Sequence, residues 1–171
     1  MKKTLLAAML ALTALPASAD IFGLSVGATA GAAQLDFQGN KEYGYEYGLN
    51  ASYALNDFFS INAGVVQGSG EVDSNLSASK NDIDYTAFPV TLRGDLPLLI
   101  GSLYAKAGTN FYDVDVARDG VKATDDGWAF TGGAGFVLTL LPLVDLSLGY
   151  EYRDMGEVTN NAVVVGVDIS L

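Results

Sequence analysis

Apolar side chains alternate with small or polar ones at every second position through most of the chain. Between residues 43 and 55, four tyrosines, two leucines and an alanine alternate with glycine, glutamate, asparagine, serine and alanine. Successive side chains of a β-strand point to opposite faces, so such a run predicts a strand with one apolar face. We expect eight strands, at residues 22–30, 43–55, 59–65, 86–93, 103–111, 128–138, 144–153 and 163–171.

The links between these strands alternate in length. Four long links, at 31–42, 68–82, 113–126 and 153–161, alternate with short turns near 56–57, 95–99 and 140–143. Long loops at one end and tight turns at the other are the layout of an outer-membrane barrel, whose long loops face outward. The pattern therefore predicts an all-β fold, an eight-stranded antiparallel up-and-down transmembrane β-barrel.

The composition of the less apolar face distinguishes a membrane barrel from a soluble one. A soluble barrel, such as a lipocalin that binds a small apolar ligand, would carry Lys, Glu and Asp on its outer face. Here that face is mostly Gly, Ser, Thr, Asn and Ala, which suits a narrow lumen filled by small side chains. Aromatic residues gather near the expected strand ends, as in the interfacial girdles of membrane barrels. We expect the apolar side chains to face lipid, with a soluble lipocalin-like barrel as the alternative.

The N-terminus has the pattern of a secretory signal peptide. Lys2 and Lys3 precede an apolar run at 4–15, and Ala17-Ser18-Ala19 supplies the small residues of a cleavage site. A membrane anchor is the alternative, but the run is shorter than the roughly 20 apolar residues that span a bilayer. We expect a cleaved signal peptide at 1–19, a barrel domain at 20–171, and export to the bacterial outer membrane.

The composition excludes several classes of function. The net charge is −11, whereas a nucleic-acid binder usually carries a basic surface. Without histidine or cysteine the chain has no Ser-His-acid triad and no zinc site built from those ligands. The glycines at 132–135 lie in an expected strand with no helix after it, so they are not a dinucleotide-binding loop. We expect no enzymatic activity and no cofactor.

Charged residues on the small-residue face are the candidates for a network inside the barrel. Counting from the short turns at about 3.3 Å per residue places Glu46, Lys106, Glu151 and Arg153 in the middle and upper lumen. A lone buried charge is costly, while a paired and hydrogen-bonded one is tolerated. We expect the two bases to pair with the two acids.

Three further charges lie close to the short turns or the C-terminus. Arg93, Asp145 and Asp168 should meet near the periplasmic mouth, with Arg93 paired to one of the two aspartates. Two roles are open for the whole network. It can simply fill and rigidify a lumen just wide enough for side chains, or its pairs can rearrange to open a narrow ion path.

Acidic residues concentrate in the expected long links. The link at 113–126 holds Asp113, Asp115, Asp119, Asp125 and Asp126. Carboxylates are suitable ligands for Ca²⁺ or Mg²⁺, which would bridge these loops to lipopolysaccharide phosphates. The spacing is not that of an EF-hand, and a solvated acidic surface is the commoner meaning of such a cluster. We expect no metal centre and keep these aspartates as weak candidates.

Three segments resemble the OmpA-like family of eight-stranded outer-membrane barrels. They are Phe88–Gly94 (FPVTLRG), Leu103–Gly108 (LYAKAG) and Leu146–Gly156 (LSLGYEYRDMG). The resemblance extends over the barrel domain in layout, and it implies a small closed barrel with structural, adhesive or barrier roles. A switchable lumen plug also resembles what is proposed for the family. Family barrels usually end in an aromatic residue that the barrel assembly machinery recognises, whereas the last residue here is Leu171.

These observations together predict a non-enzymatic outer-membrane barrel with a side-chain-filled lumen. Its role would be structural or interactive, through acidic extracellular loops. The expected partners are outer-membrane lipid, lipopolysaccharide, the assembly machinery and an extracellular partner that the sequence does not identify. The alternatives are a narrow ion channel gated by lumen salt bridges and a soluble lipocalin-like barrel.

Overall fold

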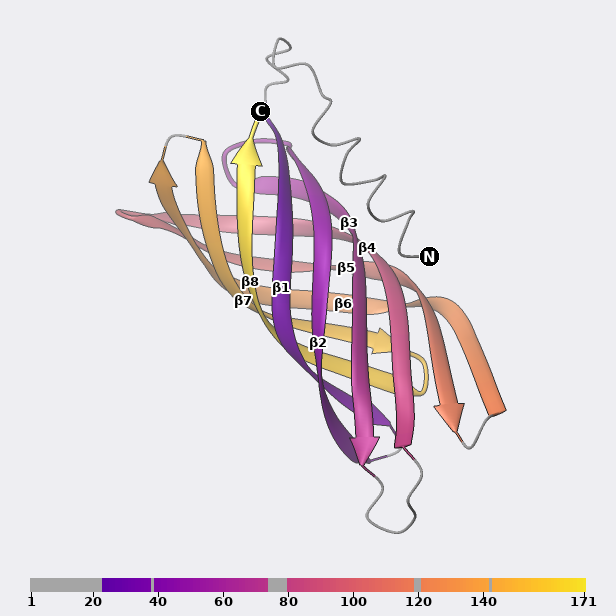
Figure 1. Cartoon of the computed structure of the whole chain (residues 1–171). Helices are drawn as coiled ribbons and strands as arrows, with labels where there is room; N and C mark the ends of the chain where they lie inside the picture. The colour runs from indigo at the N-terminus through magenta and orange to yellow at the C-terminus, as the bar shows by residue number, and fades with distance from the viewer. Residues whose placement is uncertain (1–22, 38, 74–79, 119–120, 142) are drawn as a thin grey trace.

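The alternating runs fold into eight β-strands in a computed structural model that describes residues 23–37, 39–73, 80–118, 121–141 and 143–171. The strands are β1 (Leu24–Phe37), β2 (Asn40–Ala54), β3 (Phe59–Asp73), β4 (Lys80–Leu98), β5 (Gly101–Arg118), β6 (Val121–Leu141), β7 (Val144–Met155) and β8 (Val158–Ser170). Each strand pairs antiparallel with the next, and β8 pairs with β1 to close the barrel (Figure 1). Among the described residues no helix is long and apolar enough to cross a membrane.

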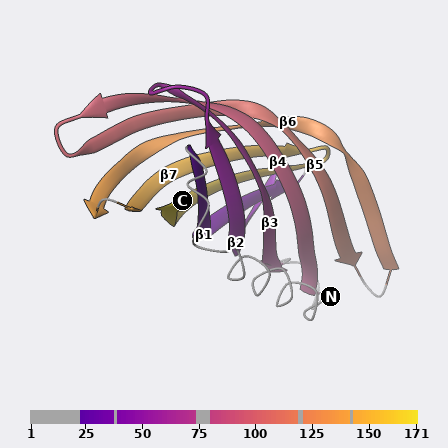
Figure 2. The same ribbon diagram turned by 90° about the horizontal axis from the view of Figure 1, so that it is seen from above.

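The strands are strongly tilted and curve around a common axis (Figures 1 and 2). β2 and β3 are joined by a tight turn at 55–58, where the side-chain carbonyl of Asn56 accepts hydrogen bonds from the backbone amides of Phe58 and Phe59. The fold class and the number of strands predicted from the sequence are confirmed. The predicted signal peptide at 1–19 lies outside the described residues.

We call the half of the barrel nearest the short turns, such as the one at 55–58, the lower part, and the other half the outer part. The apolar side chains of the lower part face outward. Tyr47, Leu148 and Val165 are between 40% and 56% exposed, while Glu46 and Glu151 point inward and are almost fully buried. Only hydrocarbon accepts such an outer wall, because a soluble barrel would bury these apolar side chains. The expected orientation is confirmed, and the soluble lipocalin-like alternative is wrong.

The prediction of long outer links at 31–42, 68–82, 113–126 and 153–161 is wrong for most of their described residues, which are paired strand. β5 runs on to Arg118 and β6 begins at Val121, so most of the expected link at 113–126 is paired strand. The alternation continues through this part, but the two faces exchange their composition. Val114 is apolar and points inward, while Asp113 and Asp115 are charged and point outward. A strand that leaves the membrane has water on its outer face, so charges move to that face and apolar residues to the inside.

Candidate functional site

A buried ion pair spans the lumen. Glu46 on β2 and Arg153 on β7 both point inward, and each is only 3% exposed. Nη1 of Arg153 donates to both carboxylate oxygens of Glu46, at 2.9 and 2.8 Å. Burying two charges is costly unless they are paired and hydrogen-bonded, so each group depends on the other.

Two more buried side chains complete the surroundings of Glu46. The Tyr85 hydroxyl donates to Glu46 Oε2 at 2.7 Å. Nδ2 of Asn160 donates to the same oxygen at 2.8 Å and to the Tyr85 hydroxyl at 2.8 Å. The Glu46 carboxylate thus has three donors from β4, β7 and β8, which hold three strands to β2 inside the barrel.

Neither Tyr85 nor Asn160 was among the predicted site residues. Asn160 falls inside the expected link at 153–161, and Tyr85 lies just before the expected strand at 86–93. Extending the alternation outward by a few residues would have placed both on the inner face. The residue opposite Tyr85 on β3 is Gly68, and a Cβ added there would overlap the Tyr85 ring. Gly68 is therefore required for the aromatic side chain to reach Glu46.

The network continues from Arg153 toward the short turns through Glu151. Nη2 of Arg153 lies 3.5 Å from Glu151 Oε2, and Nζ of Lys106 on β5 lies 2.6 Å from Glu151 Oε1. The structure thus brings together all four charges predicted for the middle and upper lumen, in the order Glu46–Arg153–Glu151–Lys106. Two acids and two bases leave the chain of charges neutral, and Lys106 is its most exposed member.

The predicted partner of Arg93 is wrong. The Arg93 guanidinium donates to the Asp95 carboxylate, with Nε 3.0 and 3.1 Å from the two oxygens, and stacks on Tyr104 at 4.3 Å. Asp95 lies two residues further along β4, so both side chains share one face of the strand and meet without crossing the lumen. Asp168 instead accepts a 2.8 Å hydrogen bond from Asn50. Asp145 lies directly opposite Asp168 in the β7–β8 register.

A small polar cavity separates the Arg93 pair from the central network. Its volume is about 70 Å³, and its lining includes Asn50, Thr91, Lys106, Glu151 and Arg153. A cavity of that size and polarity holds only a few water molecules. At this level the lumen is therefore narrow and mostly filled by side chains. Toward the short turns it widens into an opening of about 550 Å³, lined among others by Arg93, Asp145 and Asp168.

An apolar cluster closes the lumen above the network. Its buried members come from six strands and are Leu35, Val66, Ile83, Tyr85, Tyr112, Val114, Met155 and Val158. Tyr85 belongs to both layers, because its ring lies in the cluster and its hydroxyl reaches Glu46. A tightly packed apolar layer excludes water and ions. We call this group the outer cap.

The acidic residues predicted for a loop lie on two strands and two faces. Asp113 and Asp115 point away from the lumen on β5, and Asp115 accepts a 2.7 Å hydrogen bond from Thr124. Asp125 on β6 lies instead on the lumen side, 3.5 Å from the Tyr112 hydroxyl. Among the described residues no three acids gather as a metal site would require. Asp119 lies outside the described residues, and Asp126 pairs opposite Asp113.

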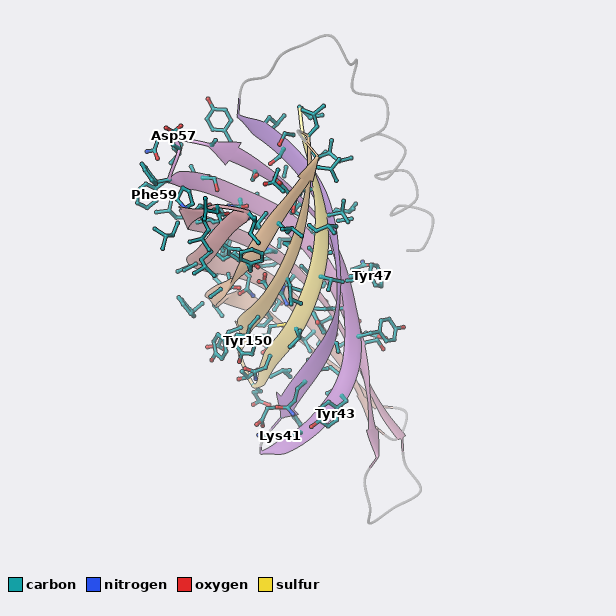
Figure 3. The ribbon with its side chains drawn as sticks, turned by 90° about the vertical axis from the view of Figure 1, so that its left-hand side faces the viewer. Lys41, Tyr43, Tyr47, Asp57, Phe59 and Tyr150 are labelled. Carbon is teal, nitrogen blue, oxygen red and sulfur yellow. The ribbon has the colours of Figure 1, made fainter. Side chains whose placement is uncertain are left out.

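An aromatic row marks the change between the two parts of the outer wall. Phe88, Phe111 and Trp128 lie opposite one another on β4, β5 and β6, with ring centroids 6.4 and 5.6 Å apart. Asp113 and Asp126 occupy the next outward positions above this row. On the other side of the barrel, Tyr43, Tyr47 and Tyr150 also project from the wall (Figure 3). Aromatic rings at this level are typical of a membrane interface.

The sequence matches the family described as outer membrane protein beta-barrel domain over residues 4–170. No curated protein sequence matches the chain.

Three solved structures show the same fold. Neisserial surface protein A is 18% identical, with a TM-score of 0.68, covering 87% of this chain and 97% of that one. Ail of Yersinia pestis, in complex with the heparin analogue sucrose octasulfate, is 16% identical, with a TM-score of 0.63, covering 86% and 97%. The N-terminal β-barrel domain of Pseudomonas aeruginosa OprF is 13% identical, with a TM-score of 0.51, covering 85% and 97%.

Proposed function

The chain belongs to the outer membrane protein β-barrel domain family, and we propose that it is a sealed, non-enzymatic barrel that displays an acidic outer wall. A signal peptide at 1–19 would direct its export, and the barrel assembly machinery would insert it. Its role in the membrane is structural and interactive: the lower wall anchors it in lipid, and the outer strands meet extracellular partners.

The layering of the lumen is the observation that carries this proposal. The central charges are paired with one another, and the outer cap lies between them and the extracellular side. An ion crossing the barrel would have to separate buried pairs and then enter an apolar layer. Separating a buried ion pair is costly because it leaves charges without partners in the interior. Entering the apolar layer is costly because the ion loses its water there.

Outward-facing tyrosines support contact with lipopolysaccharide on the side of β7, β8, β1, β2 and β3. Nε2 of Gln34 donates to the Tyr43 hydroxyl at 3.0 Å, and the Tyr47 hydroxyl donates to Gln67 at 3.1 Å. Tyr150 forms a similar pair with Asn161. Such exposed amide and hydroxyl groups suit the sugars and acyl linkages of a glycolipid better than plain hydrocarbon.

Two measurements test the proposal. Heat-modifiable migration of an outer-membrane band would support the folded membrane barrel, and a soluble periplasmic product would contradict it. In planar bilayers we expect the full chain to show no unitary conductance, and Lys106→Ala to leave the barrel closed because the outer cap is intact. Conductance steps in Lys106→Ala that exceed those of the parent would contradict the sealed lumen.

A narrow ion channel is the second candidate, and one contact favours it. Glu151 is shared between Lys106 and Arg153, at 2.6 and 3.5 Å, so it can turn fully toward Lys106 while Arg153 keeps its pair with Glu46. Opening would also require the outer cap to move. The same recordings distinguish the candidates, because the channel predicts conductance that changes when Lys106 is removed.

A further inference from the structure

β6 lacks a neighbour on one side over its outer half. Its pairing with β5 continues without a break from Val137 to Val121, whereas its pairing with β7 begins only at Thr131. The ten residues from Val121 to Phe130 therefore have no strand partner on the β7 side among the described residues. Along such an edge, the backbone amides and carbonyls of every second residue point outward unpaired.

The edge is open because β7 turns inward. Above Thr131, the Asp154 carbonyl accepts a 3.3 Å hydrogen bond from the side chain of Asn110 on β5 and pairs with no residue of β6. The next residue, Met155, is fully buried in the outer cap together with Val158 across the β7–β8 turn. The β7–β8 hairpin, which supplies Met155 and Val158 to the outer cap, therefore leaves the outer half of β6 without a partner strand on that side among the described residues.

This edge carries the charged residues Lys122, Asp125 and Asp126 but lacks two other features that commonly protect an exposed strand. It contains no proline, and its register with β5 has no bulge. It is also longer than the gap between β2 and β3, whose ladder ends at Gly44 and Gly70 and leaves unpaired across it only residues 40–43 of β2 and 71–73 of β3 among those that the structure describes. Long, regular, unpaired edges are where an extended peptide adds to a sheet.

We propose that the open edge of β6, from Val121 to Phe130, binds an extended basic segment of an extracellular protein by strand addition. The proposal rests on the interactive role inferred above and names the chemistry of the partner. The added strand would lie where β7 would have continued, and its backbone would pair with the free groups of β6.

The charges beside the edge select a basic partner. Within residues 121–130 two acids, Asp125 and Asp126, outnumber the one base, Lys122. Both aspartates are exposed, and Asp113 on β5 lies opposite Asp126. Lysine or arginine at facing positions of an added strand would pair with these carboxylates, whereas acidic residues there would be repelled. A second copy of this chain, with a net charge of −11, would bring its own carboxylates to the edge, so a basic partner is favoured over self-association.

The single tryptophan gives a direct reporter of binding. Trp128 lies at the base of the edge and is 68% exposed. The probe is a ten-residue synthetic peptide that alternates threonine and lysine, titrated onto the full protein in nanodiscs. We expect a saturable change in Trp128 emission and slower amide hydrogen exchange in residues 121–127. The same peptide with every second amide N-methylated keeps its charge but cannot pair as a strand, and we expect it to bind at least tenfold more weakly.

Substitutions separate the edge from general charge attraction. Asp126→Asn should weaken binding about two- to fivefold, in line with one facing charge pair. Asp57→Asn, in the turn at the far end of the barrel (Figure 3), is the matched control and should leave binding unchanged. Equal binding of the N-methylated peptide, or binding without protection of residues 121–127, would overturn strand addition. Failure of the proposed function would appear instead as conductance or as a soluble product.

Discussion

The lower and outer parts of β5 place opposite kinds of residue on the same two faces. In the lower part Lys106 points into the lumen and Ala107 faces outward, whereas in the outer part Val114 points inward and Asp113 outward. The backbone is one continuous strand in both parts. The medium around the barrel therefore decides which face is apolar. In lipid the outward face is apolar and the lumen is polar, whereas in water the outward face is charged and the interior is apolar.

The interior of each part is stable for a different reason. In the lower part the polar groups around Glu46 hold one another through short hydrogen bonds and ion pairs. Each partner contact stabilises a buried polar network, since an unpaired group carries its full desolvation cost, as Nε of Arg153 and Oδ1 of Asn160 do here. In the outer part, the cap around Leu35 and Val114 is an ordinary apolar core. The first interior should be sensitive to lost partners and the second to lost volume.

Removing Glu46 should break the lower interior most severely. Glu46→Ala leaves the Arg153 guanidinium buried without its main partner, and we expect a loss of about 3–5 kcal/mol in the free energy of unfolding. Urea unfolding in lipid vesicles would measure it. Glu46→Gln is the control, because it keeps an acceptor for Tyr85 and Asn160, and it should cost less than Glu46→Ala. Equal stability of Glu46→Ala and the parent would show that the pair does not hold the barrel.

One substitution placed in both parts of the outer wall should have very different effects. Val165→Lys puts a charge into hydrocarbon and should cost about 2–4 kcal/mol near the bilayer midplane. Asp113→Lys places the same side chain above the aromatic row, in water, where we expect a change within about 0.5 kcal/mol. The same vesicle unfolding assay compares them. Similar losses at both positions would mean that the wall does not change environment between them.

A smaller change tests the contact between the two interiors. Tyr85→Phe keeps the ring in the outer cap but removes the hydrogen bond to Glu46, so we expect a loss of about 1.5–3 kcal/mol. Tyr112→Phe is a suitable control, since its hydroxyl lies 3.5 Å from an exposed aspartate, and it should cost less. Indistinguishable losses in the two variants would contradict a specific role for the Tyr85 hydroxyl.

The strand count and the orientation followed from period-two alternation, but the strand ends did not. The expected strands stop where the outward face ceases to be apolar, near Phe111 and Trp128. Beyond them Asp113 and Asp115 resemble a loop when only the composition is considered. The missing signal is Val114, an apolar residue on the face that had been polar, which shows that the alternation continues with its faces exchanged.

The sequence predicts side-chain partners only where their distance along the barrel axis from the short turns determines which charges meet. Glu46, Lys106, Glu151 and Arg153 share one level of the lumen, and counting from the turns placed them together. Arg93 meets Asp95 because neighbours on one strand face are closer than residues across the mouth, a local choice that a count of depth does not reveal. The open edge of β6 was not predictable at all, since it depends on where β7 turns inward.

Cysteine accessibility along β5 tests the exchange of faces most directly, because the chain contains no cysteine of its own. Single cysteines at Ala105, Ala107, Asp113 and Asp115 all lie on the outward face, and each would be treated in nanodiscs with a charged maleimide. We expect rapid labelling at positions 113 and 115 and protection at 105 and 107, where lipid covers the wall. Equal labelling at all four positions would contradict a barrel whose lower wall lies in the membrane and whose outer wall stands in water.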